Sequence, residues 1–329
     1  MLRVALVGCG FMGRMHSSVY SSLPDVQVVA THASRMEGAE KLAADHGATV
    51  VHDLKEILES NDVDVVDICL PTDVHAETAI AALDHGKHVF CEKPMARDSF
   101  QATAMIAAAE RNNRQLMIGH CIRFWNEYAE LERLKKSGEL GELLSLNLIR
   151  YGEFPSWSID GWIGDEARSG GAALDMHIHD TDFALHLLGQ PDEVFSRGTI
   201  DDRGPSQIFT TMRFGKTVVH AEGGWNLPPK TPFKHAFRAI FERGAAIFDG
   251  GPLTVFQADG TNFVPVFASM SAGDIGGNLN DLGGYYHELK YFYDCLTTGR
   301  PMDRCTPTSA LRSLEVTLDE IRQVKEAAQ

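Results

Sequence analysis

Residues 4–16 read VALVGCGFMGRMH, and this stretch decides the fold of the first part of the chain. A short apolar run is followed by three glycines in the pattern Gly8-x-Gly10-x-x-Gly13. Glycines at these positions permit a tight strand-to-helix turn and let the backbone approach a pyrophosphate at the start of the helix. We therefore expect the loop to bind a dinucleotide through Gly8, Gly10, Phe11, Met12 and Gly13.

The residues around this loop alternate between β-rich runs and helical patterns over the first ~120 positions, as in a parallel sheet with crossover helices. Several of the runs are apolar almost throughout, which suits strands that are covered on both faces. Strands are expected at residues 3–7, 26–31, 48–51, 63–70, 88–93 and 115–119. The sequence thus predicts an α/β Rossmann domain, a doubly wound parallel sheet, over residues 1–122.

The rhythm changes after a helical stretch at 127–141. Between 143 and 267 the expected strands follow one another, with turns at RFGKTVV and FDGGPLTV. One helix interrupts these strands and two helical patterns close the chain. We predict a second, α+β domain over residues 123–329, built on a large, mostly antiparallel open sheet.

Composition limits the partners. The formal net charge of −15 argues against nucleic acid or an anionic membrane as the main partner. No apolar run approaches the roughly 20 residues that a membrane-spanning helix needs. The six cysteines show no paired spacing, which favours buried free thiols and a reducing, cytoplasmic setting.

The end of the second expected strand bears on the choice of dinucleotide. An NAD-preferring site usually has an acidic residue about 20 positions after the glycines, where it holds the ribose 2′-hydroxyl. Here Ala33 stands near that position, Ser34 and Arg35 follow, and the first acid is Glu37. A hydroxyl and a guanidinium suit a 2′-phosphate, so we predict NADP rather than NAD. The alternative is that Arg35 is a solvated residue at the start of a helix.

The middle of the chain carries a more specific resemblance. Residues 67–96 read DICLPTDVHAETAIAALDHGKHVFCEKPMA, and residues 170–182 read GGAALDMHIHDTD. Together with the glycine loop, these segments resemble the glucose–fructose oxidoreductase/inositol dehydrogenase (Gfo/Idh/MocA) family over essentially the whole chain. The resemblance implies a Rossmann domain followed by an open sheet with helices on one face. It also implies pairing through that sheet into a homodimer or homotetramer.

The family's Glu-Lys-Pro motif maps to Glu92, Lys93 and Pro94. A lysine at the carboxyl end of a parallel strand lies at the ligand crevice, where its ammonium can stabilise a substrate alkoxide. The alternative is a surface lysine paired with Glu92. The resemblance further implies a cis peptide bond before Pro94. It also implies a dinucleotide-lining loop that contains Leu70, Pro71, Thr72 and His75, although Thr72 could instead cap the following helix.

The segment LDMHIHDTDFALHLLG (174–189) concentrates acids and histidines on an expected helix. Asp175, His179, Asp182 and His186 are spaced to share one face. Asp and His four residues apart can share a metal ion, but the chain has neither an HExxH motif nor a nearby cysteine pair, so we predict no metal site. The resemblance implies that His179 accepts the proton of the substrate hydroxyl and that Asp175 orients its ring or binds an adjacent hydroxyl. Lys93 completes this catalytic set. His177 departs from the family pattern.

Other polar and aromatic residues are weaker candidates for contacting a substrate, because tryptophan more often packs than binds. The candidates are His120, Arg123, Trp157, Trp162, His177 and Tyr286, with Arg168, Asn278, Asp281 and His287 as further possibilities.

The function implied is that of an NAD(P)-dependent oxidoreductase. It would transfer hydride between nicotinamide and a secondary alcohol or ketone of a sugar, an inositol or another polyol. The main rival is a nucleotide-retaining glycoside hydrolase of the same fold that works by transient oxidation. A non-catalytic NADP(H)-binding regulator is a third class, which the set Lys93, Asp175 and His179 argues against because binding alone needs no base.

Overall fold

The protein is represented by a computed structural model that describes residues 1–156, 158–268 and 282–329. Two compact units make up the chain: Met1–Cys121 with Ser269–Leu311, and Ile122–Ala268 with Arg312–Gln329. The sequence predicted a second domain continuous from 123 to 329. The structure instead groups α9 (Gly283–Thr298) with the first unit. The reason is aromatic packing, since Phe292 of α9 lies edge-on to Phe90 with ring centroids 5.6 Å apart.

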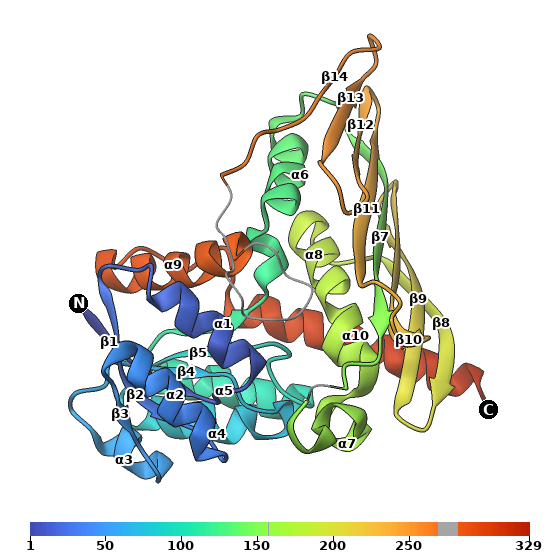
Figure 1. Cartoon of the computed structure of the whole chain (residues 1–329). Coiled ribbons are helices and arrows are strands. Elements are labelled where there is room, and N and C mark those ends of the chain that lie inside the picture. Colours follow the sequence, from blue (N-terminus) through green and yellow to red (C-terminus); the bar gives the residue numbers. More distant parts are fainter. Residues whose placement is uncertain (157, 269–281) are drawn as a thin grey trace. The chain divides into compact units, whose positions relative to one another are not determined.

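The first unit is built on a six-stranded parallel sheet with the order β3-β2-β1-β4-β5-β6, which is the Rossmann order (Figure 1). The predicted fold class is therefore confirmed. The strands are β1 (Leu2–Val7), β2 (Val26–His32), β3 (Thr49–Val50), β4 (Val65–Ile68), β5 (His88–Glu92) and β6 (Leu116–Gly119). The helices are α1 (Phe11–Tyr20), α2 (Met36–His46), α3 (Leu54–Glu59), η1 (Thr72–Val74), α4 (His75–Asp84), α5 (Ser99–Arg111) and α9.

The central strands are buried along their whole length. All four residues of β4 and all four of β6 are buried, as expected for strands with helices on both faces. The side chains are apolar with one exception, because Asp67 lies in the middle of β4 and is fully buried.

The strand register aligns the carboxyl ends of the central strands. Val7 of β1 pairs with Ile68 of β4, which pairs with Cys91 of β5, which in turn pairs with Ile118 of β6. The residues that follow these four therefore leave the sheet at one level, along the edge where open α/β sheets bind ligands.

The second unit is built on an eight-stranded sheet with the order β14-β13-β12-β11-β7-β10-β9-β8. All neighbouring strands are antiparallel except β7 and β10, which run parallel. The strands are β7 (Leu143–Glu153), β8 (Glu193–Asp201), β9 (Gly204–Phe214), β10 (Thr217–Leu227), β11 (Lys234–Phe241), β12 (Gly244–Phe248), β13 (Thr254–Gln257) and β14 (Asn262–Phe263). The mostly antiparallel sheet that the sequence predicted is confirmed.

Helices cover one face of this sheet (Figure 1). They are η2 (Cys121–Phe124, whose first residue belongs to the first unit), α6 (Asn126–Ser137), η3 (Ile159–Gly164), α7 (Glu166–Ser169), the π-helical turn η4 (Ala173–His177), α8 (Ile178–Leu188) and α10 (Pro307–Ala327, which belongs to this unit from Arg312 onward). Trp225 of β10 is fully buried on this inner face, where Phe154 lies edge-on to it. Val324 of α10 belongs to the same apolar cluster.

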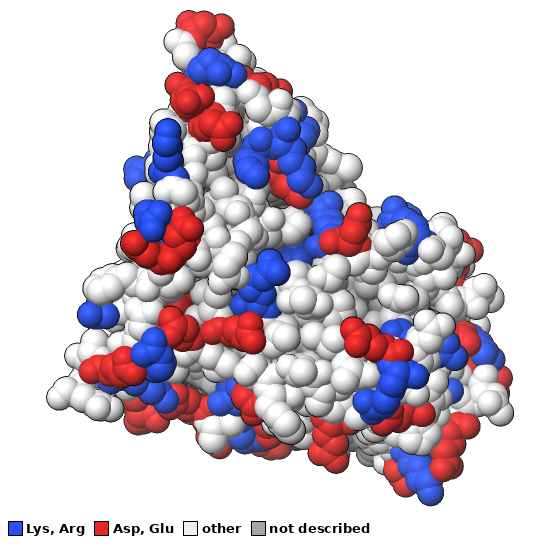
Figure 2. All heavy atoms as spheres, turned by 180° about the vertical axis from the view of Figure 1, so that it is seen from behind, with Lys and Arg blue, Asp and Glu red and all other residues white. Residues whose placement is uncertain are grey.

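Acidic and basic side chains are interspersed over the molecular face shown in Figure 2, with uncharged surface between them. Within the described ranges, no helix is both long and apolar enough to cross a lipid bilayer.

Candidate functional site

The glycine loop joins β1 to α1, and each of its glycines has a distinct structural role. Gly8 has φ +102°, and a Cβ there would lie 2.3 Å from the carbonyl oxygen of Cys69. A Cβ on Gly13 would lie 2.0 Å from the carbonyl oxygen of Gly8, so the turn closes only without side chains. At Gly10, by contrast, the Cβ direction has no described atom within 4 Å. The loop is therefore open at Gly10, where a phosphate would approach the backbone.

Helix α1 begins at Phe11 with Gly10 as its N-cap, and no described side chain accepts a capping hydrogen bond there. The N-terminal N–H groups carry the positive end of the helix dipole. A tight turn, an open backbone and a helix start with no described side-chain cap together fit the pyrophosphate of a dinucleotide.

The end of β2 is where the adenosine ribose of a dinucleotide would lie in this fold. The strand ends at His32, Ala33 is buried, and Ser34 and Arg35 are exposed before α2 begins. Glu37, in the first turn of α2, is the first acidic residue after the strand. Arg35 is therefore the first charged side chain after the strand, and Glu37 follows it two residues later.

The loop after β4 is braced by His75. Its Nδ1 lies 2.9 Å from the carbonyl oxygen of Pro94 and its Nε2 lies 2.8 Å from that of Leu70. Burial lowers the pKa of His75 despite these two backbone contacts. The ring thus ties the loop after β4 to the loop after β5. Thr72 is buried and opens η1, for which Pro71 is the N-cap, so the structure does not use Thr72 as a helix cap.

Glu92 ends β5, and Lys93 and Pro94 follow at the carboxyl edge of the sheet. The Lys93–Pro94 peptide bond is cis, as the family resemblance implied. Lys93 is half-buried, and its backbone N–H donates to Oε2 of Glu92 at 3.2 Å. Gly8 follows Val7 and Glu92 follows Cys91, and both Val7 and Cys91 pair with Ile68 of β4. The glycine loop and the Glu-Lys-Pro turn therefore leave the sheet level with each other, with β4 between their strands.

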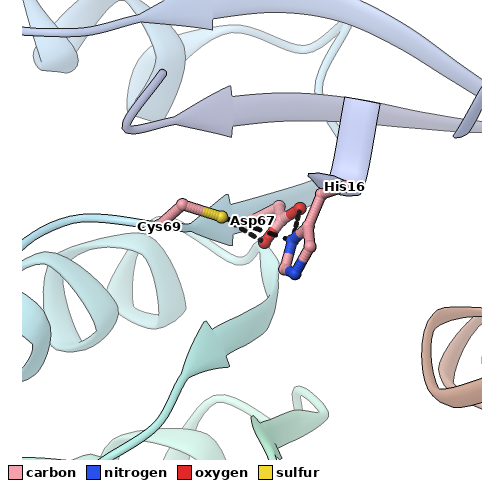
Figure 3. A group of neighbouring side chains, drawn as sticks. All are labelled: His16, Asp67 and Cys69. Carbon is pink, nitrogen blue, oxygen red and sulfur yellow. Dashed lines mark hydrogen bonds and ion pairs between the residues drawn. The ribbon is translucent and has the colours of Figure 1, made fainter. Parts of the chain in front are cut away.

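A largely buried polar cluster that was not predicted from the sequence follows the central strands. His16 of α1, Asp67 of β4 and Cys69 just beyond β4 point toward one another (Figure 3). His16 Nδ1 lies 2.8 Å from Asp67 Oδ2 and 3.2 Å from Cys69 Sγ. Two signals could have revealed the cluster: a histidine three residues after Gly13, and an aspartate inside an otherwise apolar strand.

In the second unit, the segment rich in acids and histidines forms η4 and α8. Asp175 lies in the π-helical turn and His179 in the first turn of α8, and both are half-buried. Lys93 belongs to the first unit. That these three side chains act together stays a prediction.

Most other polar side chains of α8 are engaged in buried ion pairs and hydrogen bonds. Asp180 binds Arg150 of β7 at 3.2 Å, and burial raises the pKa of Asp180 against the opposing effect of that guanidinium. His186 lies 3.2 Å from Glu132 of α6. Asp182 of the expected polar stripe is likewise paired with Arg123 of η2, so the stripe is not a solvated face.

The candidate substrate contacts have several different environments. Arg123 is buried and paired with Asp182, with Nε 2.8 Å from Oδ2. His177 is fully buried against the sheet, with Nε2 3.1 Å from the hydroxyl of Thr210. Neither ring nor guanidinium is exposed in this conformation.

Of the remaining candidates, His120 is buried just beyond β6, and Trp162 packs on the apolar cluster around Trp225. Arg168 in α7 is half-buried, as is Tyr286 of α9, whereas the adjacent His287 is exposed. Trp157, Asn278 and Asp281 lie outside the described residues.

The fold and the glycine loop define a dinucleotide-binding Rossmann protein with an attached antiparallel-sheet domain. Comparison with known families agrees: the oxidoreductase family with an NAD-binding Rossmann fold matches residues 2–120, and the GFO/IDH/MocA C-terminal domain matches residues 128–247. The chain belongs to the Gfo/Idh/MocA oxidoreductase family.

Known relatives include dehydrogenases of sugars and inositols. The D-glucoside 3-dehydrogenase of Escherichia coli K12 is 34% identical over 194 residues, which cover 58% of this chain and 55% of that protein. The inositol 2-dehydrogenase of Rhizobium meliloti is 32% identical over 189 residues, covering 57% and 56%. The chain thus aligns with little more than half the length of these relatives. A solved levoglucosan dehydrogenase in complex with NADH and levoglucosan has the same fold, with a TM-score of 0.84, 23% identity and coverage of 99% and 97%.

Proposed function

We propose that this protein is a nicotinamide-dependent dehydrogenase or reductase that acts on a secondary alcohol or ketone of a sugar or polyol. The observation that carries the proposal is that the glycine loop and the Glu92-Lys93-Pro94 turn both leave one parallel sheet at its carboxyl edge, at the same height along the strands. Adjacent strands are roughly 4.8 Å apart, so the two strand spacings from β1 across β4 to β5 separate the pyrophosphate loop from Lys93 by about 10 Å. That spacing suits one extended cofactor lying along the edge.

Each protein group has a distinct role in this proposal. The bound nicotinamide supplies or accepts the hydride. His179 takes the proton of the substrate hydroxyl, a task for which an imidazole is suited near neutral pH. Asp175 orients that imidazole, and the ammonium of Lys93 stabilises negative charge on the substrate oxygen. Ketone reduction reverses the same proton movements.

The basic end of β2 supports NADP as the preferred cofactor. Ser34 and Arg35 are exposed there, and Glu37 is the first acid after the strand. A guanidinium and a hydroxyl can bind a 2′-phosphate, which an aspartate would repel.

A second copy of this chain is the proposed partner of the outer face of the eight-stranded sheet. The register places the exposed side chains of Phe209 in β9 and Val218 in β10 on one face of the sheet. The exposed Ile247 of β12 and Phe256 of β13 lie on that same face farther along the sheet. An apolar face on one large sheet is self-complementary in a two-fold dimer.

Phe209→Arg should convert the oligomer to a monomer in sedimentation experiments, whereas Thr211→Arg should do so less because it removes no apolar area. A wild-type monomer at all concentrations would contradict the proposal.

The proposed activity is tested with a panel of sugars, inositols and keto-sugars, following the absorbance of the reduced nicotinamide with both cofactors. We expect turnover with at least one polyol or sugar, and a loss of kcat of about 10²-fold or more in Lys93→Ala and in His179→Ala, with cofactor binding retained. His186→Gln on the same helix is the matched control and should keep its kcat. Release of a free sugar with no net change in cofactor would favour the glycoside hydrolase instead.

A further inference from the structure

Three ionisable side chains from three elements of the first unit meet in its interior. His16 of α1 lies between Asp67 of β4 and Glu92 of β5, with Nδ1 2.8 Å from Asp67 Oδ2 and Nε2 3.2 Å from Glu92 Oε1. His16 and Asp67 are 0% exposed and Glu92 is 5% exposed. Figure 3 shows the His16 ring directed at Asp67.

The two carboxylates determine the protonation of the ring. An ionised carboxylate only accepts hydrogen bonds, whereas a neutral imidazole has one donor and one acceptor nitrogen. Because each ring nitrogen faces a carboxylate oxygen, a neutral ring would direct a lone pair at one of them. With both carboxylates ionised, both nitrogens are satisfied only when His16 is an imidazolium, and one imidazolium then offsets part of the charge of two buried carboxylates.

The rest of the surroundings agree with this assignment. The hydroxyl of Tyr20 donates to Asp67 Oδ2 at 2.5 Å, and the hydroxyl of Tyr293 donates to that of Tyr20 at 3.0 Å. Cys69 Sγ lies 3.2 Å from Nδ1. Burial alone would lower the pKa of His16, but the effects of Asp67 and Cys69 outweigh burial and raise that pKa well above its usual value.

The chain of hydrogen bonds reaches the backbone of Lys93. Oε1 of Glu92 lies 3.2 Å from Nε2 of His16. Oε2 of the same carboxylate accepts a hydrogen bond from the backbone N–H of Lys93, also at 3.2 Å. One carboxylate therefore connects a fully buried ring to the residue that follows β5. Gly119 approaches the same oxygen closely, since a Cβ there would lie 3.1 Å from Oε1.

We propose that His16 is a positioning residue: as an imidazolium held by Asp67, it fixes the Glu92 carboxylate and thereby sets the backbone from which the Lys93 ammonium projects. This inference rests on the proposed role of Lys93. His16, Asp67 and Cys69 could also hold a metal ion, because their ligand atoms lie within 4.8 Å of one another. We favour the hydrogen-bonded network, since 2.8 Å between Nδ1 and Oδ2 is the length of a charge-assisted hydrogen bond.

Two amide variants separate the two ends of the ring. The side-chain nitrogen of His16→Gln takes the place of Nε2 and still donates toward Glu92, whereas that of His16→Asn takes the place of Nδ1 and donates only toward Asp67. We expect kcat to fall about 100-fold in His16→Asn and about tenfold or less in His16→Gln, because a displacement of roughly 1 Å at a reacting group costs about 10²-fold in rate. The affinity for the dinucleotide should change little in either variant. Equal losses in both variants would overturn the positioning role.

Ser17→Ala is the matched control for a buried change in the same helix. Ser17 is 4% exposed and its hydroxyl bonds His46 at 2.8 Å, so the variant removes a hydrogen bond without touching Glu92. Its kcat should stay that of the wild type. A loss as large as that of His16→Asn would show that any disturbance of α1 is sufficient and would contradict the proposal.

A measurement on the wild-type protein is independent of turnover. Nitrogen NMR of the labelled histidines distinguishes an imidazolium, whose two nitrogens have similar shifts, from a neutral ring. We expect His16, assigned with the His16→Gln variant, to remain an imidazolium at pH 8 and to become neutral there in Asp67→Asn. A neutral His16 in the wild type, or a stoichiometric metal ion lost in His16→Gln, would overturn the inference. Full activity of Lys93→Ala would instead refute the proposed function while leaving the NMR result intact.

Discussion

Arg123 and Asp182 form a two-point ion pair inside the second unit, with Nε–Oδ2 and Nη2–Oδ1 distances of 2.8 and 2.5 Å. Both side chains are almost wholly buried, and the hydroxyl of Ser313 in α10 also donates to Asp182, at 2.7 Å. The pair therefore joins η2, α8 and α10. Arg123 was a candidate substrate contact on sequence grounds, but this geometry directs its guanidinium to Asp182.

Removing one partner of this pair should destabilise the protein strongly. Asp182→Ala leaves the Arg123 guanidinium buried without its carboxylate, so we expect the free energy of unfolding to fall by about 3–5 kcal/mol in urea titrations. The control is Glu139→Ala, which removes the exposed pair with Arg133 and should cost less than about 1 kcal/mol. Similar losses of unfolding free energy in the two variants would contradict a larger stabilising role for the buried pair.

Two glycines of the same loop should respond differently to alanine. The added Cβ of Gly10→Ala meets no described atom within 4 Å, so the fold should keep its stability while the affinity for the dinucleotide falls by about tenfold or more. In Gly13→Ala the Cβ would lie 2.0 Å from the Gly8 carbonyl oxygen, so the melting temperature should fall as well. Calorimetry of melting and of cofactor binding separates the two effects. Unchanged binding in Gly10→Ala would place the pyrophosphate elsewhere.

Arg35 should discriminate between the two nicotinamide cofactors. If its guanidinium binds the 2′-phosphate, Arg35→Ala should weaken NADPH binding by about tenfold, which corresponds to roughly 1.4 kcal/mol. NADH binding should be unaffected because NADH lacks that phosphate. Direct titrations with both cofactors test this, and a wild-type protein that binds NADH as tightly as NADPH would contradict the preference.

The stabilising effect of His16 should depend on pH in a defined direction. Its pKa is raised on folding, so the imidazolium stabilises the folded state fully below the unfolded pKa of about 6.5. That stabilisation is lost as the pH rises from there through the folded pKa. The difference in unfolding free energy between wild type and His16→Gln should therefore shrink from pH 6 to pH 9. A difference that grows over this range would mean that His16 is neutral in the folded protein.

The first unit could be predicted from sequence because its information is local. An apolar strand, three spaced glycines and a helix identify the first turn, and the Glu-Lys-Pro motif marks the end of β5. The two sheets were predicted for the same reason. The placement of α9 with the first unit was not, because it depends on aromatic contacts such as Phe292 with Phe90, which join residues about 200 positions apart.

The partners of the polar side chains of α8 could not be predicted from the sequence. Spacing predicted that Asp182 and His186 share a face with Asp175 and His179, but not that Arg123, Glu132 and Arg150 supply partners for its acids and histidines. The His16–Asp67–Glu92 contact was missed for a similar reason. These residues belong to three separate elements, and only the sheet register brings β4 and β5 together beside α1.

The proposed hydride transfer is tested most directly with deuterium. The protein would be incubated with reduced nicotinamide cofactor that carries deuterium at both C4 positions and with the keto-sugars and inosose compounds of the panel, and the products analysed by mass spectrometry. We predict one deuterium on the carbinol carbon of the product, incorporated about 10²-fold or more slowly when His179→Ala replaces the wild type. Deuterium that stays on the cofactor with every compound would contradict it.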